Sequence, residues 1–159
     1  MAKTRPTRAG EENKLLGKNV LLFLNYGENA SYESPAWALL GGQRSADYNA
    51  SADEIDLTDK TSGGYGDSEP GLKTAELTVE LIVKPNDETV KEMYTAYDAD
   101  EPVDILRWAK DGRSIRNWYS ITSLEESAAY DDACILSLTL KGKGAPTYIE
   151  AMEDPREQA

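Results

Sequence analysis

Acidic side chains are the residues of this chain best suited to chemistry. They gather at Asp98, Asp100 and Glu101 and in two adjacent pairs, Glu125-Glu126 and Asp131-Asp132. Such oxygen ligands bind hard cations, but a calcium loop also needs a glycine at its sixth position and a distant glutamate, which are missing. Adjacent residues on a strand point to opposite faces, so neither pair makes a carboxylate dyad for acid–base catalysis. We interpret the triplet as an acidic turn that ends a helix.

The composition removes most other catalytic chemistry. The 159 residues contain no histidine, which excludes Ser-His and Cys-His nucleophiles and the commonest metal ligand. A single cysteine, Cys134, allows neither an intrachain disulfide nor a thiolate cluster, and its apolar neighbours predict that it is buried. The glycine-rich run Ser62–Gly66 lacks the Lys-Ser/Thr end of a phosphate loop. We predict a protein that is not an enzyme, with no catalytic residue, metal or cofactor.

Charge and hydropathy limit the partners. Apolar residues make up 40% of the chain, charged residues 29%, and the net charge is −12. An acidic surface argues against nucleic-acid binding, because neutralising phosphates needs basic side chains. The apolar run Val20–Leu24, as long as any in the chain, is far too short to span a bilayer, and no apolar segment of a secretory signal follows the basic N-terminal residues. We expect a protein made and used on the cytosolic side, without a membrane partner.

Hydrophobic patterning predicts an antiparallel sheet protein with one packed helix. Residues 74–84 alternate strictly, with Ala75, Leu77, Val79, Leu81 and Val83 on one face. Further strands are expected at 20–24, 43–57, 103–109, 115–124 and 132–142, with a bulge at 50–52 and a hairpin turn at 110–113.

The predicted helix follows Pro85. Asn86 is its expected N-cap, and the stripe Val90, Met93, Tyr94 and Tyr97 recurs at helical spacing. We expect these tyrosines, with Trp108 and Trp118, to lie in the core. Around the domain, assigned to residues 17–148, we expect a flexible N-terminal arm at 1–16 and an acidic C-terminal tail at 149–159.

A long polar loop precedes the alternating strand. It closes at Pro70-Gly71 and has no apolar anchor except Tyr65, so we expect that it cannot pack on itself. Loops of this length are uncommon in compact domains unless they have a function or are disordered. We therefore assign it as an arm that a neighbouring subunit orders. The assigned residues are Thr58, Asp59, Lys60, Thr61, Ser62, Gly63, Gly64, Tyr65, Gly66, Asp67 and Ser68.

A family resemblance rests on the order and spacing of several short segments. They are Gly17–Leu22, Gly41–Ser45, Glu54–Thr58, Pro70–Lys73, Ile121–Glu125 and the last strand, Leu136–Leu140, with Gly142 and Gly144. In these segments, residues 17–148 resemble the major tail (tail tube) proteins of long-tailed bacteriophages, specifically the TP901-1-like family, which also includes gene-transfer-agent tail proteins.

The resemblance implies a fold and an assembly. The fold would be mainly β, an antiparallel β-sandwich or barrel with one flanking α-helix, related in shape to the tube protein of type VI secretion. Such proteins form hexameric rings that stack into a tail tube through which DNA passes without specific binding. The implied partners are other copies of the chain, the tape measure protein, the tail terminator and the baseplate or distal tail proteins. The implied location is the virion tail, assembled in the host cytoplasm.

Within that resemblance, the acidic charge gains a role. Glu76 and Glu80, on the polar face of the alternating strand, are candidates to line the lumen and repel DNA phosphates. The alternative is that they are solubilising surface residues. Two other functions stay open at this point: a type VI secretion-like tube protein, and a β-sandwich binding module that does not assemble.

Overall fold

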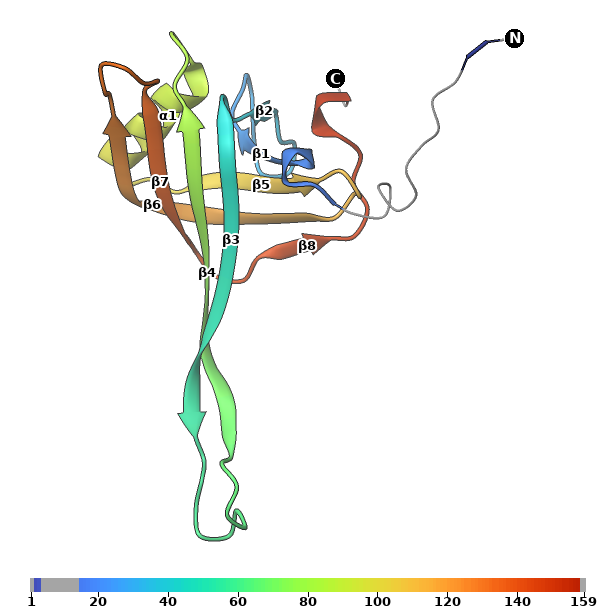
Figure 1. The fold of residues 1–159 in the computed structure, drawn as a ribbon, viewed down its shortest axis with the longest axis vertical. Coiled ribbons are helices and arrows are strands. Elements are labelled where there is room, and N and C mark those ends of the chain that lie inside the picture. Colours follow the sequence, from blue (N-terminus) through green and yellow to red (C-terminus); the bar gives the residue numbers. More distant parts are fainter. Residues whose placement is uncertain (1, 4–14, 158–159) are drawn as a thin grey trace.

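The computed structural model describes residues 2–3 and 15–157 (Figure 1). In chain order its elements are η2 (Gly17–Asn19), β1 (Val20–Asn25), β2 (Trp37–Leu39), β3 (Gln43–Asp56), β4 (Ser68–Ile82), α1 (Glu88–Asp98), β5 (Val103–Ala109), β6 (Ser114–Ser127), β7 (Ile135–Gly142), β8 (Thr147–Ile149) and η3 (Pro155–Glu157). In these ranges every strand pair is antiparallel and α1 is the one α-helix, which confirms the predicted fold class. Most of the predicted N-terminal arm lies outside the described residues.

One sheet, with strand order β2-β1-β5-β6-β7-β4-β3, folds over into two layers. Strand β6 belongs to both, because Ser114–Tyr119 pair with β5 whereas Tyr119–Ser127 pair with β7. A register shift between Ile121 and Ser123 accompanies this change of partner, as expected where a bulge bends a strand. Figure 1 shows β5 and the first half of β6 crossing β3 and β4 at a steep angle, whereas the second half of β6 runs beside β7. The result is a sandwich whose two layers are continuous through β6.

The interior between the layers is apolar. The alternation predicted for residues 74–84 is confirmed, since Ala75, Leu77, Val79 and Leu81 are buried, although β4 ends at Ile82. Leu136, Leu138 and Leu140 of β7, Leu22, Leu24 and Ile105 of the other layer, and Val90 and Met93 of α1 complete this core. Each fully buried leucine or isoleucine contributes roughly 1.5–3 kcal/mol relative to an exposed one, so this core supplies the main stabilisation.

A smaller cluster stabilises the C-terminal segment on the opposite side of the β1–β5 layer. Phe23, Leu106 and Trp108 are buried there, and Ile149 and Met152 pack against them. The indole Nε1 of Trp108 also donates to the Met152 carbonyl oxygen at 3.0 Å. The part of the acidic C-terminal tail described by the structure therefore packs on the body of the domain.

The side chain of Gln43 joins the two ends of the sheet. Its Nε2 donates to the carbonyl oxygens of Leu22 and Leu40, at 2.7 and 2.8 Å, and its Oε1 accepts from the Leu22 N–H at 2.8 Å. The Gln43 amide makes hydrogen bonds of the kind that the backbone of a neighbouring strand would make. They attach the start of β3 to β1, although these two strands do not pair with each other.

Helix α1 begins one residue later than predicted. Asp87, not Asn86, is its N-cap, and the Asp87 carboxylate accepts from the Thr89 N–H at 3.1 Å. Asn86 occupies the turn before it, with a positive φ of 57°. Aspartate and asparagine cap helices about equally well, so neighbouring candidates cannot be separated by residue type. No helix in the described ranges is long and apolar enough to cross a membrane.

The face of α1 that is buried also differs from the predicted one. Ala96 is buried beside Val90 and Met93, whereas Tyr97 is 44% exposed. Tyr94 is half-buried, and its hydroxyl donates to the Glu126 carboxylate at 2.6 Å. This hydrogen bond, together with burial, raises the pKa of Tyr94 to about 12.

Two further burial predictions are wrong. Cys134 is exposed, because β7 begins at Ile135 and Cys134 lies in the turn before it. Trp118 is 38% exposed, because alternation along β6 turns Asn117 and Tyr119 inward. The prediction for Trp108, a buried residue of β5, is confirmed.

Candidate assembly interface

A two-stranded hairpin projects from one end of the domain. Pairing between β4 and β7 stops at Glu76, whereas pairing between β3 and β4 continues to Asp56 and Ser68. Residues 51–74, which we call the hairpin arm, are therefore held only by each other, and Figure 1 shows them extending far below the two layers. Nearly every side chain of the hairpin arm is exposed on both faces. An extension of this kind adds little to the stability of its own domain and is available for contact with another molecule.

The tip of the hairpin arm, residues 57–67, has a defined local structure. The Leu57 N–H donates to the Asp67 carbonyl oxygen at 2.8 Å, and the Thr58 hydroxyl oxygen accepts from the Asp67 N–H, also at 2.8 Å. Within the turn, the Ser62 and Tyr65 N–H groups donate to the carbonyl oxygens of Asp59 and Ser62. Hydrogen bonds hold this conformation, although nearly all side chains of the loop, Tyr65 included, stay exposed and do not pack on one another.

The boundaries of the loop also differ from the prediction. Pro70 and Gly71 lie within β4, opposite Glu54 and the bulge between Ala52 and Glu54, and do not close the loop. Of the eleven residues assigned to the arm, Ser68 is the first residue of β4, and the other ten form the tip after Leu57. The structure thus places all eleven at the far end of one projection.

Two carboxylates stabilise the tip in a pH-dependent way. The Asp56 carboxylate accepts from the Thr58 N–H at 2.9 Å, and the Asp59 carboxylate accepts from the Thr61 hydroxyl at 2.6 Å and N–H at 2.8 Å. The hydrogen bonds from Thr58 lower the pKa of Asp56, and those from Thr61 lower the pKa of Asp59. Their contribution is therefore present above the ordinary aspartate pKa and is lost as the pH falls through the lowered values.

Apolar side chains on the hairpin arm have no partner in their own domain's core. Ile55, Leu57 and Leu72 are 49%, 44% and 73% exposed, and Tyr65 at the tip is 80% exposed. Exposed apolar groups gathered on one extension are typical of surfaces that another molecule covers.

The two candidate lumen acids lie on a polar sheet face. Glu76 and Glu80 point away from the core, and each has a basic neighbour: Lys141 Nζ lies 2.5 Å from Glu76 Oε2, and Arg44 Nη1 lies 3.6 Å from Glu80 Oε1. Sequence reasoning missed both partners. The alternation within residues 132–142 could have placed Lys141 on a polar face, but the cross-strand register that brings it to Glu76 could not be predicted.

The rest of this face is polar as well. Cross-strand neighbours of the β4 residues on it are Ser45, Asp47, Asn49, Ser137 and Thr139, and Glu125 of β6 lies beside Ser137. We call the outward side of β6-β7-β4-β3 the polar face. Its acids outnumber its bases, and its opposite side is the core.

The layer that carries the polar face has two open edges. In the described residues, β3 pairs with β4 alone, and no strand pairs with the far side of β6 beyond Tyr119. β3 and β6 lie at opposite sides of the four-stranded layer and run in opposite directions. Unpaired edges are sites for strand addition, so the layer can extend antiparallel pairing to a further copy on either side.

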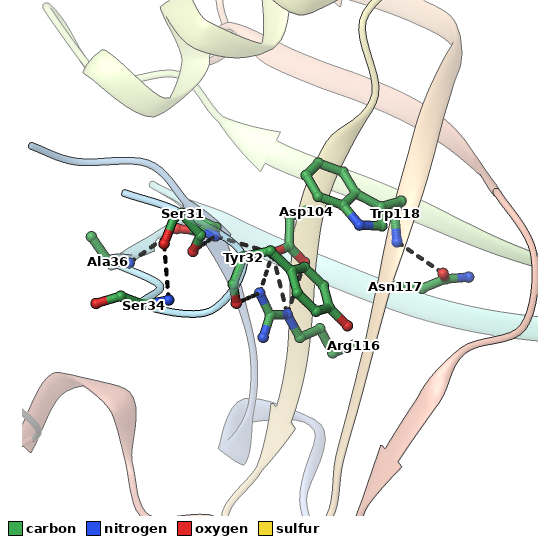
Figure 2. Close-up of polar contacts among 9 residues, drawn as sticks. Ser31, Tyr32, Ser34, Ala36, Asp104, Arg116, Asn117 and Trp118 are labelled. Carbon is green, nitrogen blue, oxygen red and sulfur yellow. Dashed lines mark hydrogen bonds and ion pairs between the residues drawn. The ribbon is translucent and has the colours of Figure 1, made fainter. Parts of the chain in front are cut away.

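The most buried ion pair fixes the loop between β1 and β2. Figure 2 shows Arg116 of β6 between Asp104 of β5 and the aromatic ring of Tyr32, to which the guanidinium lies 3.9 Å from the centroid. Arg116 Nη2 lies 2.5 Å from Asp104 Oδ2 and also donates to the Tyr32 carbonyl oxygen at 2.9 Å. The Asp104 and Arg116 side chains are only 2% and 13% exposed. Because every polar atom that is named here has a protein partner, the cluster is structural.

We expect Arg116→Met to lower the free energy of unfolding by roughly 3–5 kcal/mol, because it leaves the buried Asp104 carboxylate without its cation. The double variant Arg116→Met with Asp104→Leu should recover much of that loss, since both charges are removed. Urea unfolding of the two variants measures the difference. A loss below about 1 kcal/mol for the single variant would contradict this role for the pair.

The acidic groups considered for metal binding do not converge. In residues 2–3 and 15–157, no three carboxylate or thiol side chains are close enough together to hold a metal ion. Asp100 has a positive φ of 56° directly after α1, as a helix-ending turn requires.

Comparison with known proteins identifies relatives of the whole domain. A family model described as phage tail tube protein matches residues 14–148. Comparison with curated proteins gave no significant match.

Solved structures share the fold. The chain is similar to a subunit in the tail of an empty gene transfer agent particle refined with C6 symmetry, with 19% identity over 85% of this chain and 98% of that one and a TM-score of 0.73. It is similar to the SPP1 tail tube subunit, with 16% identity over 91% and 84% and a TM-score of 0.74. A chain of the anti-feeding prophage baseplate is 8% identical over 93% and 97%, with a TM-score of 0.60.

Proposed function

The chain belongs to the phage tail tube protein family, and from this membership we propose that it closes into hexameric rings that stack into a tail tube. The tube is the conduit through which DNA leaves the particle. The proposal makes the protein a structural component of a virion tail, without an enzymatic activity of its own.

The observation that carries the proposal is the pair of open edges on one layer. Since β3 and β6 run in opposite directions, β3 of one subunit can pair antiparallel with β6 of the next, and the same step repeats around a ring. Closure leaves no edge exposed, which removes the aggregation risk of an open sheet. The C6 symmetry of the similar gene-transfer-agent tail supports six subunits in the ring.

The polar face gives such a ring its inner wall. One side of the four-stranded layer is the apolar core, and α1 and the second layer lie on that side. When the layer closes into a barrel, the polar face must therefore line the lumen. Glu76 and Glu80 lie on this face with Asp47 and Glu125, and their excess over Arg44 and Lys141 disfavours adhesion of DNA phosphates.

The hairpin arm accounts for stacking. It projects beyond the layer along the strand direction, as Figure 1 shows, and so reaches past its own ring. Its exposed apolar side chains and structured tip suit contact with a subunit in the adjoining ring. In a complete tail, the end rings would meet the tail terminator and the baseplate or distal tail proteins, and the lumen would hold the tape measure protein before DNA passes. Assembly would take place in the host cytoplasm.

Negative-stain electron microscopy of the concentrated full-length protein tests the proposal. We expect rings with sixfold symmetry and stacks of them, and we expect the same preparation to dissociate on dilution, because each edge contact is small. A protein that stays monomeric at every concentration, with no ring or tube in the images, would show that the chain does not assemble by itself.

A further inference from the structure

The open edge of β3 is free for strand addition only beyond Ala46. The Ala46 carbonyl oxygen accepts a hydrogen bond at 3.1 Å from Nε of Arg107, a residue of β5, so it points away from β4. The N–H and C=O groups of alternate strand residues point to the same edge, so those of Tyr48 and Ala50 also point outward. Within the described ranges β3 pairs with β4 alone, which leaves the outward groups of Tyr48 and Ala50 without a strand partner. At Ala46 the Arg107 side chain already occupies the edge.

The open edge of β6 presents its backbone groups at Leu124 and Glu126. The Thr139 carbonyl oxygen of β7 accepts from the Thr122 hydroxyl at 3.2 Å, so it points toward β6. Ser123 pairs with Thr139 and therefore directs its own N–H and C=O toward β7. By the same alternation, the backbone groups of Leu124 and Glu126 point away from β7, toward a neighbouring subunit.

Side chains restrict how the two edges can be aligned. Tyr48 and Leu124 pack against the apolar core, and Glu126 accepts a hydrogen bond from α1 on that same side. Asn49 and Glu125 lie on the polar face. A slip of one residue would turn every side chain to the other face, so a ring that keeps one apolar and one polar side allows only displacements by an even number of residues.

The tilt of strands in a closed barrel sets the size of the displacement. Within one subunit, Leu124 lies in the same row as Leu138, Val79 and Ala46. Barrel strands tilt by about 35–45° and lie about 4.8 Å apart, so crossing the four strands of one layer moves the row by roughly 13–19 Å, or about four to six residues. A closed ring is therefore not expected to pair Ala46 with Leu124 of the next subunit.

The direction of the displacement follows from the free part of β3. Moving by four residues in one direction would put Leu124 opposite the turn that precedes β3, where Arg107 and Gln43 already bind the edge. Moving by four in the other direction puts Leu124 opposite Ala50. A displacement of six in that direction would leave the outward groups of Tyr48 unpaired. The displacement by four uses the free backbone groups of both edges and leaves the Arg107 hydrogen bond intact.

We propose that ring closure pairs β3 of one subunit with β6 of the next in this single register. The opposed residues, from β3 and from β6 of the next subunit, are Tyr48 with Glu126, Asn49 with Glu125, and Ala50 with Leu124. This inference rests on the proposed function, because it presupposes the ring. It adds the residues of the subunit contact, in which Leu124 covers the exposed Ala50 and the Asn49 amide meets the Glu125 carboxylate on the lumen wall.

Disulfide cross-linking in the full-length chain measures the register. Asn49→Cys with Glu125→Cys, in a Cys134→Ser background, would place two thiols in a non-hydrogen-bonded pair with Cα atoms about 4.5 Å apart, within disulfide range. Mild oxidation of assembled rings should give a covalent ladder that ends at the hexamer on a non-reducing gel. Each link must join two subunits, because the two positions lie on opposite edge strands of one subunit's layer.

The controls are pairs that fit the other registers. Ser45→Cys with Glu125→Cys fits the undisplaced register, and Ser51→Cys with Glu125→Cys fits the displacement by six. In the proposed ring both pairs have Cα atoms more than about 7 Å apart, so they should yield at least roughly tenfold less cross-linked product. All three pairs lie on the polar face, so they are equally open to the oxidant.

A proline substitution tests the same contact without a covalent link. Ala50→Pro removes an outward N–H that the β3–β4 ladder does not use, so the subunit should stay folded by circular dichroism but form no rings. Normal rings of this variant would overturn the register. A ladder from either control pair in place of the Asn49 pair would also overturn it, while leaving the ring intact. If the wild-type chain forms no rings, the proposed function fails, and the register fails with it.

Discussion

Replacing Thr58–Gly66 with Asn-Gly will abolish tubes and leave the subunit folded. The exchange keeps the Leu57–Asp67 pair, whose hydrogen bond closes the tip, and Asn-Gly is the preferred two-residue turn between paired strands. The shortened arm no longer reaches an adjoining ring. Its loss should change the free energy of unfolding by less than about 1 kcal/mol, since the tip packs on nothing else in the domain. Negative-stain images and thermal unfolding measure both effects.

Replacing the tip is a cleaner test than a deletion that reaches into β4. A deletion of Ser62–Ser68 would take the first residue of β4 and break the Asp56–Ser68 pair, so a failure to assemble would have two explanations. A second variant carries a Gly/Ser loop of the original length in place of Thr58–Gly66. It tests whether stacking depends on the length of the arm or on the side chains at its tip. Rings without tubes in the short variant support the role of the hairpin arm. Tubes of normal appearance in the short variant would show that stacking does not depend on it.

Reversing Glu76 and Glu80 to lysine will leave rings and tubes intact but slow DNA ejection by roughly tenfold or more, because an attractive wall holds the phosphates. Each reversal changes the charge by two, so each subunit gains four positive charges on the polar face. Both acids are partly exposed and lie outside the core, so the fold should tolerate the change. The measurement is the time course of DNA release from particles that carry the variant.

The basic neighbours of these acids provide a matched control. Exchanging Glu76→Lys with Lys141→Glu moves the charges across the same cross-strand pair without altering the net charge of the face. This exchange should release DNA at the wild-type rate. Normal release from particles with the double lysine variant would mean that Glu76 and Glu80 are solubilising surface residues and that the lumen charge does not depend on them.

The sequence predicted the strands that have one buried face. Residues 74–84 alternate because every second side chain enters the core, and the hairpin turn at 110–113 is marked by Gly112, whose φ is 95°. The sequence of the hairpin arm shows no such alternation of apolar and polar residues. From Ser68 to Lys73 nearly every position of β4 is exposed, so nothing selects apolar residues at alternate positions, and this part of the strand looks like a polar loop. Its pairing comes from the partner strand, which local patterns do not describe.

Long-range register explains the other differences. Glu76 and Lys141 are 65 positions apart, and only the pairing of β4 with β7 brings them together. Small shifts in element boundaries account for Cys134 and Tyr97, since one position along a strand or a helix changes which side chains are buried. The chemistry of individual residues was visible in the sequence, but their gathering into surfaces was not.

In the proposed tube, the projection of the hairpin arm away from its own domain would also set the order of events in assembly. A single tip offers a small, mostly polar and salt-sensitive contact, which is weak between two free subunits. A closed ring presents all of its tips at fixed spacing, so after one binds, the others act at a high effective concentration. Avidity would then make a ring a far better partner than a monomer, and elongation would follow ring closure without a separate signal.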